Sequence, residues 1–312
     1  MGIEIVQAVG MPPAIQQELE KRYTIHRLWE ARDREALLSE VSPRVRGMVT
    51  SGSVGASRAL IEALPKLEII SSFGVGYDPI DIGCAKERGV IVTNTPDVLT
   101  DDVADIAMAL TLAMMRRIPQ GDHFVRQGRW PKEKFPLTDK LGGKVMGIVG
   151  LGRIGQAIAR RAEPFGVEVR YFGPRRKEGV SYRYYDDLVA MAKDVDILMI
   201  ACPGGKATEN LVNAAVIEAL GPKGYVVNIA RGSVVDEPVL VKALVEGRLA
   251  GAGLDVFADE PNVPEALLKL DSVALAPHVG SATHATRNAM GELVLKNLAA
   301  HFDGQPVLTR VV

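Results

Sequence analysis

The stretch Lys144–Ala162, KVMGIVGLGRIGQAIARRA, joins an apolar strand to an alanine-rich helix through three glycines. Gly150 allows a tight turn, Gly152 lets a ligand approach the backbone, and Gly155 lets the helix pack closely on the strand. The start of such a helix offers unpaired N–H groups and a partial positive charge to phosphates. Similar glycines occur in βα turns that bind nothing, but their position between strand and helix favours a pyrophosphate site. The stretch therefore predicts a parallel α/β domain that binds a dinucleotide.

The end of the next predicted strand, GVEVRYF at 166–172, is where NAD-binding domains carry an acidic residue for the ribose, about 20 residues after the first glycine. This chain has Gly173 there, followed by Arg175, Arg176 and Lys177. The glycine removes the repulsion that an acid exerts on a 2′-phosphate, while two guanidiniums and an ammonium attract one. A solvated basic loop is the alternative interpretation. We favour the phosphate contact, which predicts NADP(H) in preference to NAD(H).

The composition narrows the remaining possibilities. A chain of 312 residues with 47% hydrophobic and 24% charged residues is typical of a water-soluble protein with two domains. The net charge of −1 gives no electrostatic basis for binding nucleic acid or an anionic membrane. Cys84 and Cys202 form no C-x-x-C pair, so we expect neither a disulfide framework nor a metal site. The chain shows no signal peptide and no apolar run of roughly 18 residues, which predicts a cytoplasmic protein.

Short β-rich runs alternate with helical ones along the chain, which is typical of parallel α/β sheets. In the first part, the predicted strands are 3–9, 46–52, 67–74 and 90–96, and the predicted helices are 13–23, 34–41, 57–65 and 81–89. This pattern predicts a flavodoxin-like unit. A long helix follows at 97–117, with Asp97 or Thr100 as its cap.

The second α/β series begins at Lys144 and predicts a Rossmann domain. Its later strands are expected in 196–203, 224–232, 249–257 and 272–280, followed by a long helix at 281–302 and a strand-like tail at 304–312. We expect the last helix and tail to return to the first domain. The predicted division is 1–97 plus 285–312 for the substrate-binding domain and 98–284 for the cofactor domain. The polar stretch 123–144 has no periodicity and is expected to be irregular, and a dimerisation arm is expected at 119–143.

Three later strands each end in a chemically apt side chain, at the edge where open α/β sheets bind ligands. Arg231 follows GYVVNIA and has the geometry to hold a carboxylate. Asp255 ends the next strand, with Glu260 in the loop beyond it. His278 is the one histidine of five in a Pro-His-Val-Gly turn at a strand end. A histidine near a carboxylate favours the imidazolium, an acid suited to protonating the alkoxide that forms when hydride reduces a ketone.

Taken singly, each of these side chains has an ordinary structural interpretation, but their order carries more information. The segments GLGRIG, NIARGSVVDE, GLDVFADEP and APHVGSATHATR, together with FGVGYDPID at 73–81, resemble the D-isomer-specific 2-hydroxyacid dehydrogenases over nearly the whole chain. RQGRW and ALVEGRLAGAGLDVF are most similar to the glyoxylate/hydroxypyruvate reductases and hydroxyphenylpyruvate reductases of that family. The resemblance implies two Rossmann-like or flavodoxin-like domains with parallel sheets and an active site in the cleft between them. It also implies a homodimer formed through the cofactor domains.

The resemblance assigns roles to particular residues. Arg231 would bind the substrate carboxylate and keto oxygen, His278 would act as general acid, and Glu260 would orient the imidazole and favour its protonated form. Asp255 would contact the nicotinamide carboxamide. The expected cofactor-binding residues are Gly150, Gly152, Arg153, Ile154, Gly155, Gly173, Arg175, Arg176, Lys177, Cys202, Pro203, Thr208, Ile229, Ala230, Asp255, His278 and Gly280. The expected substrate-binding residues are Ser53, Val54, Val75, Gly76, Trp130, Arg231 and His278.

Two features of the resemblance leave alternatives. Trp130 would line the active site of a partner subunit, or else anchor a core or an interface. Where relatives commonly have Pro-Leu-Thr, this chain has Pro203, Gly204 and Gly205, which makes the loop beside the nicotinamide more flexible.

The predicted function is NADPH-dependent reduction of small 2-keto acids, converting glyoxylate to glycolate and hydroxypyruvate to D-glycerate. Reduction of arylpyruvates such as hydroxyphenylpyruvate is the alternative within the enzyme class, because small residues in SGSVG, 51–55, would leave room for a ring. A dinucleotide-sensing corepressor is the alternative from another class. Such a protein would need partner-binding extensions, and the chain ends shortly after its last predicted helix.

Overall fold

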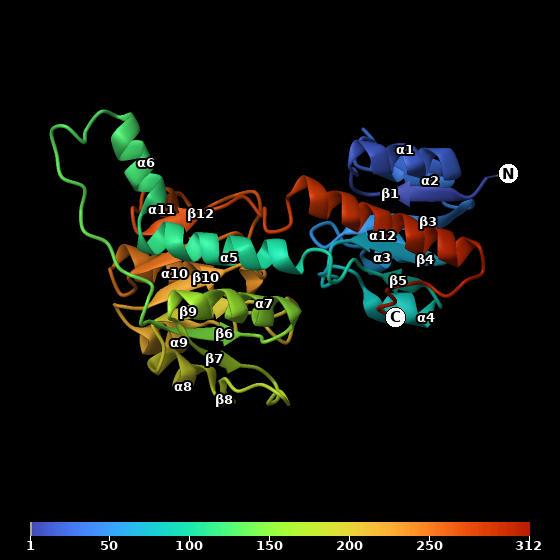
Figure 1. The fold of residues 1–312 in the computed structure, drawn as a ribbon. Helices are drawn as coiled ribbons and strands as arrows, with labels where there is room; N and C mark the ends of the chain where they lie inside the picture. The colour runs from blue at the N-terminus through green and yellow to red at the C-terminus, as the bar shows by residue number, and fades with distance from the viewer. Residues whose placement is uncertain (1) are drawn as a thin grey trace. The chain divides into compact units, whose positions relative to one another are not determined.

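The computed structural model describes residues 2–312, which divide into two compact units (Figure 1). One unit comprises residues 2–99 and Ser281–Val312, and the other comprises Thr100–Gly280. Each unit contains one parallel sheet flanked by helices, which confirms the predicted α/β fold class. Within residues 2–312, no helix combines the length and the apolar composition needed to cross a membrane.

The first unit has a five-stranded parallel sheet in the order β2-β1-β3-β4-β5. Its elements are β1 Glu4–Gln7, α1 Pro13–Arg22, β2 Thr24–Arg27, α2 Arg34–Val41, β3 Val45–Ser51, α3 Arg58–Glu62, β4 Ile69–Phe73, α4 Ile82–Glu87, β5 Ile91–Thr93 and α12 His284–Phe302. The predicted strands and helices of this region all form: α2 has its predicted bounds, β3 is shifted by one residue, and the others are shorter than predicted. The sequence prediction missed β2. This edge strand, Thr-Ile-His-Arg, is largely exposed and has no apolar run.

The chain returns to the first unit after Gly280. α12 packs on α1 and β4, and the approach is close: a Cβ built on Gly291 would lie 2.6 Å from Cγ1 of Ile15. The tail was predicted to be a strand, but it makes one isolated antiparallel bridge, between Arg310 and Thr93. The Val311 N–H also donates to the Val92 carbonyl at 2.7 Å, and Asn297 Oδ1 accepts the N–H of Leu308 at 2.9 Å.

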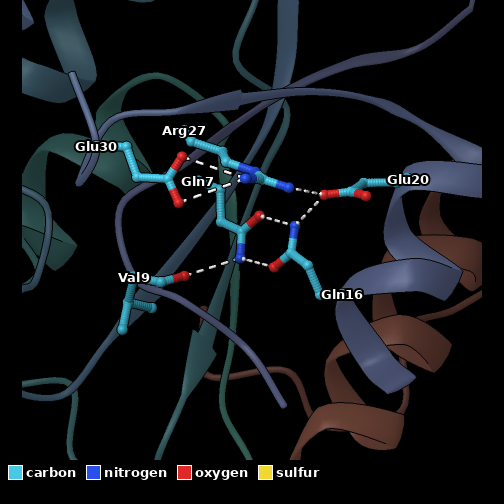
Figure 2. Close-up of polar contacts among 6 residues, drawn as sticks. All are labelled: Gln7, Val9, Gln16, Glu20, Arg27 and Glu30. Atoms are coloured by element: carbon cyan, nitrogen blue, oxygen red, sulfur yellow. Dashed lines mark hydrogen bonds and ion pairs between the residues drawn. The ribbon is translucent and has the colours of Figure 1, made fainter. Parts of the chain in front are cut away.

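A polar cluster closes the carboxyl end of β1 (Figure 2). Gln7 is fully buried, and its Nε2 donates to the Val9 carbonyl and to Oε1 of Gln16, both at 2.8 Å. Gln16 returns a bond from its own Nε2 to Oε1 of Gln7 at 3.1 Å. Arg27 connects the end of β2 to Glu20 of α1 and to Glu30. The pairing satisfies a buried amide, which would otherwise destabilise the fold, and holds the loop after β1 in place.

The second unit has a seven-stranded parallel sheet in the order β12-β11-β10-β9-β6-β7-β8. Its elements are α5 Thr100–Met115, α6 Ile118–Arg126, β6 Val145–Val149, α7 Arg153–Ala162, β7 Glu168–Phe172, β8 Arg183–Tyr185, α8 Leu188–Lys193, β9 Ile197–Ile200, α9 Ala214–Leu220, β10 Tyr225–Asn228, α10 Glu237–Val245, β11 Gly251–Leu254, α11 Glu265–Leu268 and β12 Val273–Leu275. Short 3₁₀ turns lie at Glu163–Phe165 and Gly232–Val234. α5 packs against α7 and against β10, β11 and β12. Strand order reverses at β6, and such a switch point is where doubly wound sheets bind ligands.

The stretch 123–144 differs from the irregular arm predicted for it. α6 continues through its first residues to Arg126, because Phe124 is buried and lies edge-on to Phe135 with ring centroids 5.4 Å apart. The remaining part, 127–144, forms neither helix nor strand. Trp130 is 69% exposed, which rules out its interpretation as a core anchor within this chain.

Candidate active site

The glycine loop has the geometry of a pyrophosphate site. Gly150 has φ +96°, and its N–H donates to the Phe172 carbonyl at the end of β7. A Cβ built on Gly155 would lie 2.3 Å from the Gly150 carbonyl oxygen, so α7 packs directly on the turn. A Cβ built on Gly152, at the start of α7, would meet no atom within 4 Å. The N-terminus of α7 thus has free space beside the Gly152 backbone, and this space fits a diphosphate group.

The basic loop, residues 173–177, directly follows β7, the strand next to β6. β7 ends at Phe172, and the side chains of Arg175, Arg176 and Lys177 are exposed. Gly173 also has open space where a side chain would be. No acidic residue lies between the end of β7 and the two arginines, so the repulsion that such a residue would exert on an anionic ligand is absent.

The loop after β9 is shaped by its own hydrogen bonds. The Thr208 hydroxyl donates to the Pro203 carbonyl at 2.7 Å, and Gly205 takes φ +114°. Cys202 is buried behind Gly150, where a Gly150 Cβ would lie 2.7 Å from its Cα. Burial raises the pKa of the Cys202 thiol to about 11, so this cysteine packs as a neutral side chain.

Arg231 follows β10 and is positioned by a buried asparagine. Asn228, 1% exposed, accepts the N–H of Ala230 at 3.0 Å and donates to the Arg231 carbonyl at 2.9 Å. A guanidinium N–H of Arg231 donates to the Ala230 carbonyl at 2.7 Å. Gly232 then packs so tightly that an added Cβ would lie 2.0 Å from the Phe257 backbone. The loop that carries Arg231 therefore lies directly on the loop that leads to Glu260.

His278 and Glu260 form a pair of complementary side chains at this edge of the sheet. His278 Nδ1 lies 2.6 Å from Glu260 Oε2, while Glu260 Oε1 accepts the Phe257 N–H at 3.1 Å. His278 takes φ +52°, and its N–H donates to the Asp255 carbonyl at 2.8 Å. With Nδ1 engaged by the carboxylate, Nε2 is the ring nitrogen that faces away from Glu260 and suits proton transfer to a ligand.

Asp255 connects the ends of β11 and β12. Its carboxylate is 1% exposed and accepts the N–H groups of Val279 at 2.7 Å and Gly280 at 2.8 Å. Burial raises the pKa of Asp255, and these two backbone bonds oppose that effect. The arrangement fixes the turn that carries His278.

The predicted substrate-binding residues of the first unit follow adjacent strands. Ser53 and Val54 come after β3, with the Ser53 hydroxyl 3.0 Å from that of Ser51 and with Val54 52% exposed. Val75 and Gly76 come after β4, and Asn94 Nδ2 donates to the Val75 carbonyl at 2.9 Å. The structure thus brings these four residues to one edge of the first sheet, while Arg231, Glu260 and His278 share an edge of the second.

Sequence reasoning missed the residues that hold these loops. Asn228 is the last residue of β10, and Asn94 directly follows β5. A polar residue at the end of an apolar strand was the sequence feature that could have identified them. Arg287, on α12, lies 5.5 Å from the Phe73 ring centroid, and burial lowers the pKa of its guanidinium. Within the described part of the chain, Arg287 forms no ion pair. Its position in the sequence, after a histidine motif, did not indicate the contact with Phe73.

Comparison with known proteins gives consistent matches. Residues 108–280 match the family model of the D-isomer specific 2-hydroxyacid dehydrogenase, NAD binding domain. The chain is 51% identical to a hydroxyphenylpyruvate reductase of Plectranthus scutellarioides and 50% identical to a glyoxylate/hydroxypyruvate reductase of Arabidopsis thaliana, each over 99% of both chains. A solved NADPH-dependent glyoxylate/hydroxypyruvate reductase from Sinorhizobium meliloti, in complex with NADP and malonate, superposes with a TM-score of 0.92. It is 44% identical, with 100% of this chain and 97% of the other covered.

Each of these matches is specific, and together they cover both units of the chain. The identities far exceed what a shared fold alone would give, and the matched region contains the glycine loop, Arg231, Glu260 and His278. The chain is thus an oxidoreductase, and it belongs to the D-isomer-specific 2-hydroxyacid dehydrogenase family.

Proposed function

We propose that this protein reduces small 2-keto acids, with glyoxylate and hydroxypyruvate as its main substrates. The observation that carries the proposal is the 2.6 Å contact between His278 Nδ1 and Glu260 Oε2, with Glu260 beyond a loop that packs against the one carrying Arg231. A charged fork for the carboxylate and an oriented imidazole for the carbonyl oxygen are what a 2-keto acid reduction requires.

Each residue of the site has its own role in the proposed reaction. The Arg231 guanidinium binds the substrate carboxylate and polarises the keto oxygen. His278 holds a proton on Nε2 and passes it to that oxygen as the alkoxide forms, while Glu260 keeps the ring oriented through Nδ1. The nicotinamide dinucleotide held by this unit would supply the hydride that the keto carbon receives. Gly150, Gly152 and the start of α7 would hold its pyrophosphate, and Asp255 would lie next to its carboxamide.

Preference for NADPH over NADH is the second part of the proposal. It is supported by the exposed Arg175 and Arg176, by the missing acid after β7, and by the Sinorhizobium meliloti relative crystallised with NADP. Each hydrogen bond from a guanidinium to a phosphate contributes about 1.5–3 kcal/mol. The double variant Arg175→Ala/Arg176→Ala should therefore raise KM for NADPH by roughly 10-fold or more and leave KM for NADH within about 2-fold. Arg160→Ala, an exposed arginine on α7, is the matched control, and equal effects on both cofactors would contradict the assignment.

Reduction of arylpyruvates is the second candidate, favoured by the 51% identity to a hydroxyphenylpyruvate reductase. Identity does not separate the two, because the glyoxylate/hydroxypyruvate reductase is 50% identical. Initial rates of NADPH oxidation with glyoxylate, hydroxypyruvate and hydroxyphenylpyruvate decide between them. The main proposal expects the highest kcat/KM with the two small acids, and the absence of turnover on all three would favour a dinucleotide-sensing role.

We also propose a homodimer that uses the arm 119–143. Its support is that this stretch exposes three large apolar side chains, those of Val125, Trp130 and Leu137. Light scattering after gel filtration should give twice the 33.6 kDa chain mass. A single-chain mass for the wild type would exclude this assembly.

A further inference from the structure

The basic loop after β7 is held at both ends by two tyrosine hydroxyls. The Lys177 N–H donates to Oη of Tyr171 at 2.9 Å, and the Tyr184 hydroxyl donates to the Gly173 carbonyl at 3.0 Å. These bonds bracket the five residues 173–177, which include both arginines. The side chains of Arg175 and Arg176 are both exposed.

The two tyrosines support each other. Tyr171 on β7 and Tyr184 on β8 are direct partners in the parallel pairing of these strands, and their ring centroids lie 5.3 Å apart. Tyr171 is 1% exposed, so its ring is fixed in the core, and Tyr184 is half-buried against it. Cross-strand aromatic pairs of this kind stabilise a sheet, and here they also aim two hydroxyl groups at one loop.

The loop begins beside the glycine turn. The carbonyl of Phe172, the residue before Gly173, accepts the Gly150 N–H at 2.9 Å. The tyrosine bonds therefore hold in place the loop that carries Arg175 and Arg176 and that begins beside the predicted pyrophosphate site. A loop that is already ordered loses less conformational entropy when it binds a ligand, which increases affinity.

We infer that Tyr171 and Tyr184 are positioning residues for the 2′-phosphate of NADPH, and that they determine cofactor selectivity without touching the cofactor. The inference rests on the proposed assignment of Arg175 and Arg176 to that phosphate. Removal of either hydroxyl releases one end of the loop, and the arginines then bind the phosphate from many conformations.

The test uses Tyr171→Phe and Tyr184→Phe, with Tyr182→Phe as control. Tyr182 lies just before β8, and its hydroxyl donates to Glu163 rather than to the loop. Calorimetric titration with 2′,5′-ADP reports the phosphate site, and titration with 5′-AMP reports the rest of the adenosine site. Loss of one hydrogen bond should weaken 2′,5′-ADP binding about 3- to 10-fold in each tyrosine variant and leave 5′-AMP binding within about 2-fold. The control should match the wild type for both ligands.

Kinetics and a double-mutant cycle complete the test. KM for NADPH should rise in the two variants while kcat at saturating NADPH stays at the wild-type value. Tyr184→Phe should have no further effect on 2′,5′-ADP affinity when Arg175 and Arg176 are already alanine. Tyr184 is the less buried of the pair, so its variant keeps the test valid if Tyr171→Phe perturbs folding.

The outcomes separate the two proposals. If the double arginine variant binds 2′,5′-ADP as tightly as the wild type, the phosphate assignment itself is wrong. If the arginine variant is weakened and both tyrosine variants are not, the arginines need no positioning and the inference fails. Equal weakening of 2′,5′-ADP and 5′-AMP by the tyrosine variants would also overturn it, because the tyrosines would then support the whole adenosine site.

Discussion

Replacing Gly155 or Gly152, which follow β6, by alanine should affect stability and cofactor affinity in different ways. In Gly155→Ala, the new Cβ would lie 2.3 Å from the Gly150 carbonyl oxygen, and real Cβ contacts are almost never shorter than 3.0 Å. The turn and α7 must separate by the difference, about 0.7 Å. Gly150 cannot yield easily, because it is itself packed on the Cα of Cys202 and takes φ +96°.

The expected cost follows from that contact. Overpacking of this kind typically lowers the free energy of unfolding by about 1–3 kcal/mol. Gly152→Ala is the matched variant, because its Cβ would meet no atom within 4 Å and its backbone, at φ −78° and ψ −160°, suits alanine. An N-cap change without a clash should cost below about 1 kcal/mol. Its methyl group would instead occupy the space proposed for the pyrophosphate.

Two assays on purified protein distinguish these effects. Urea unfolding of the cofactor-free enzyme, followed by circular dichroism, measures stability, and fluorescence titration with NADPH measures binding. Gly155→Ala should lose both stability and affinity, whereas Gly152→Ala should keep its stability and lose affinity by roughly 10-fold or more. Wild-type NADPH affinity in Gly152→Ala would refute the placement of the cofactor, and wild-type stability in Gly155→Ala would refute the packing argument.

Three further changes test the catalytic edge of the second sheet. His278→Ala should lower kcat by about 10²- to 10⁴-fold in the NADPH oxidation assay while NADPH still binds, and unchanged turnover would remove His278 from the mechanism. Asn228→Ala leaves the Ala230 N–H without its buried acceptor, so urea unfolding should show a loss of about 1–3 kcal/mol and KM for the keto acid should rise more than KM for NADPH. Burial raises the pKa of the Cys202 thiol from 9.0 to about 11, so the folded state retains its proton longer than the unfolded state and stability should fall as pH rises from about 9 to 11. Cys202→Ala should flatten that part of the stability profile, and an unchanged slope would contradict the assignment.

The sequence predicted the elements whose signal is local. The three glycines between strand and helix indicated a doubly wound domain, and the structure has that strand, turn and helix at 145–162. The apolar strands of both sheets were found for the same reason. β2 was missed because an exposed edge strand carries little hydrophobic pattern, and the helical start of 123–144 was missed because the burial of Phe124 against Phe135 is a tertiary contact.

The candidate site shows the same division. Residue type and position after a strand were enough to single out Arg231, Glu260 and His278 and to note the basic residues after 166–172. The supporting residues were not predictable, since Asn228, Tyr171 and Tyr184 are ordinary strand residues until their partners are known.

By itself, therefore, the sequence determined which chemical groups this protein carries and in what order along two α/β series. Only the tertiary structure decided how those groups are held: Nδ1 of His278 against Glu260, Gly155 against Gly150, and the hydroxyl of Tyr184 against Gly173. The physical reason is that side-chain composition and periodicity are encoded residue by residue. Contacts between loops depend instead on strand order and register, which arise when the whole sheet assembles.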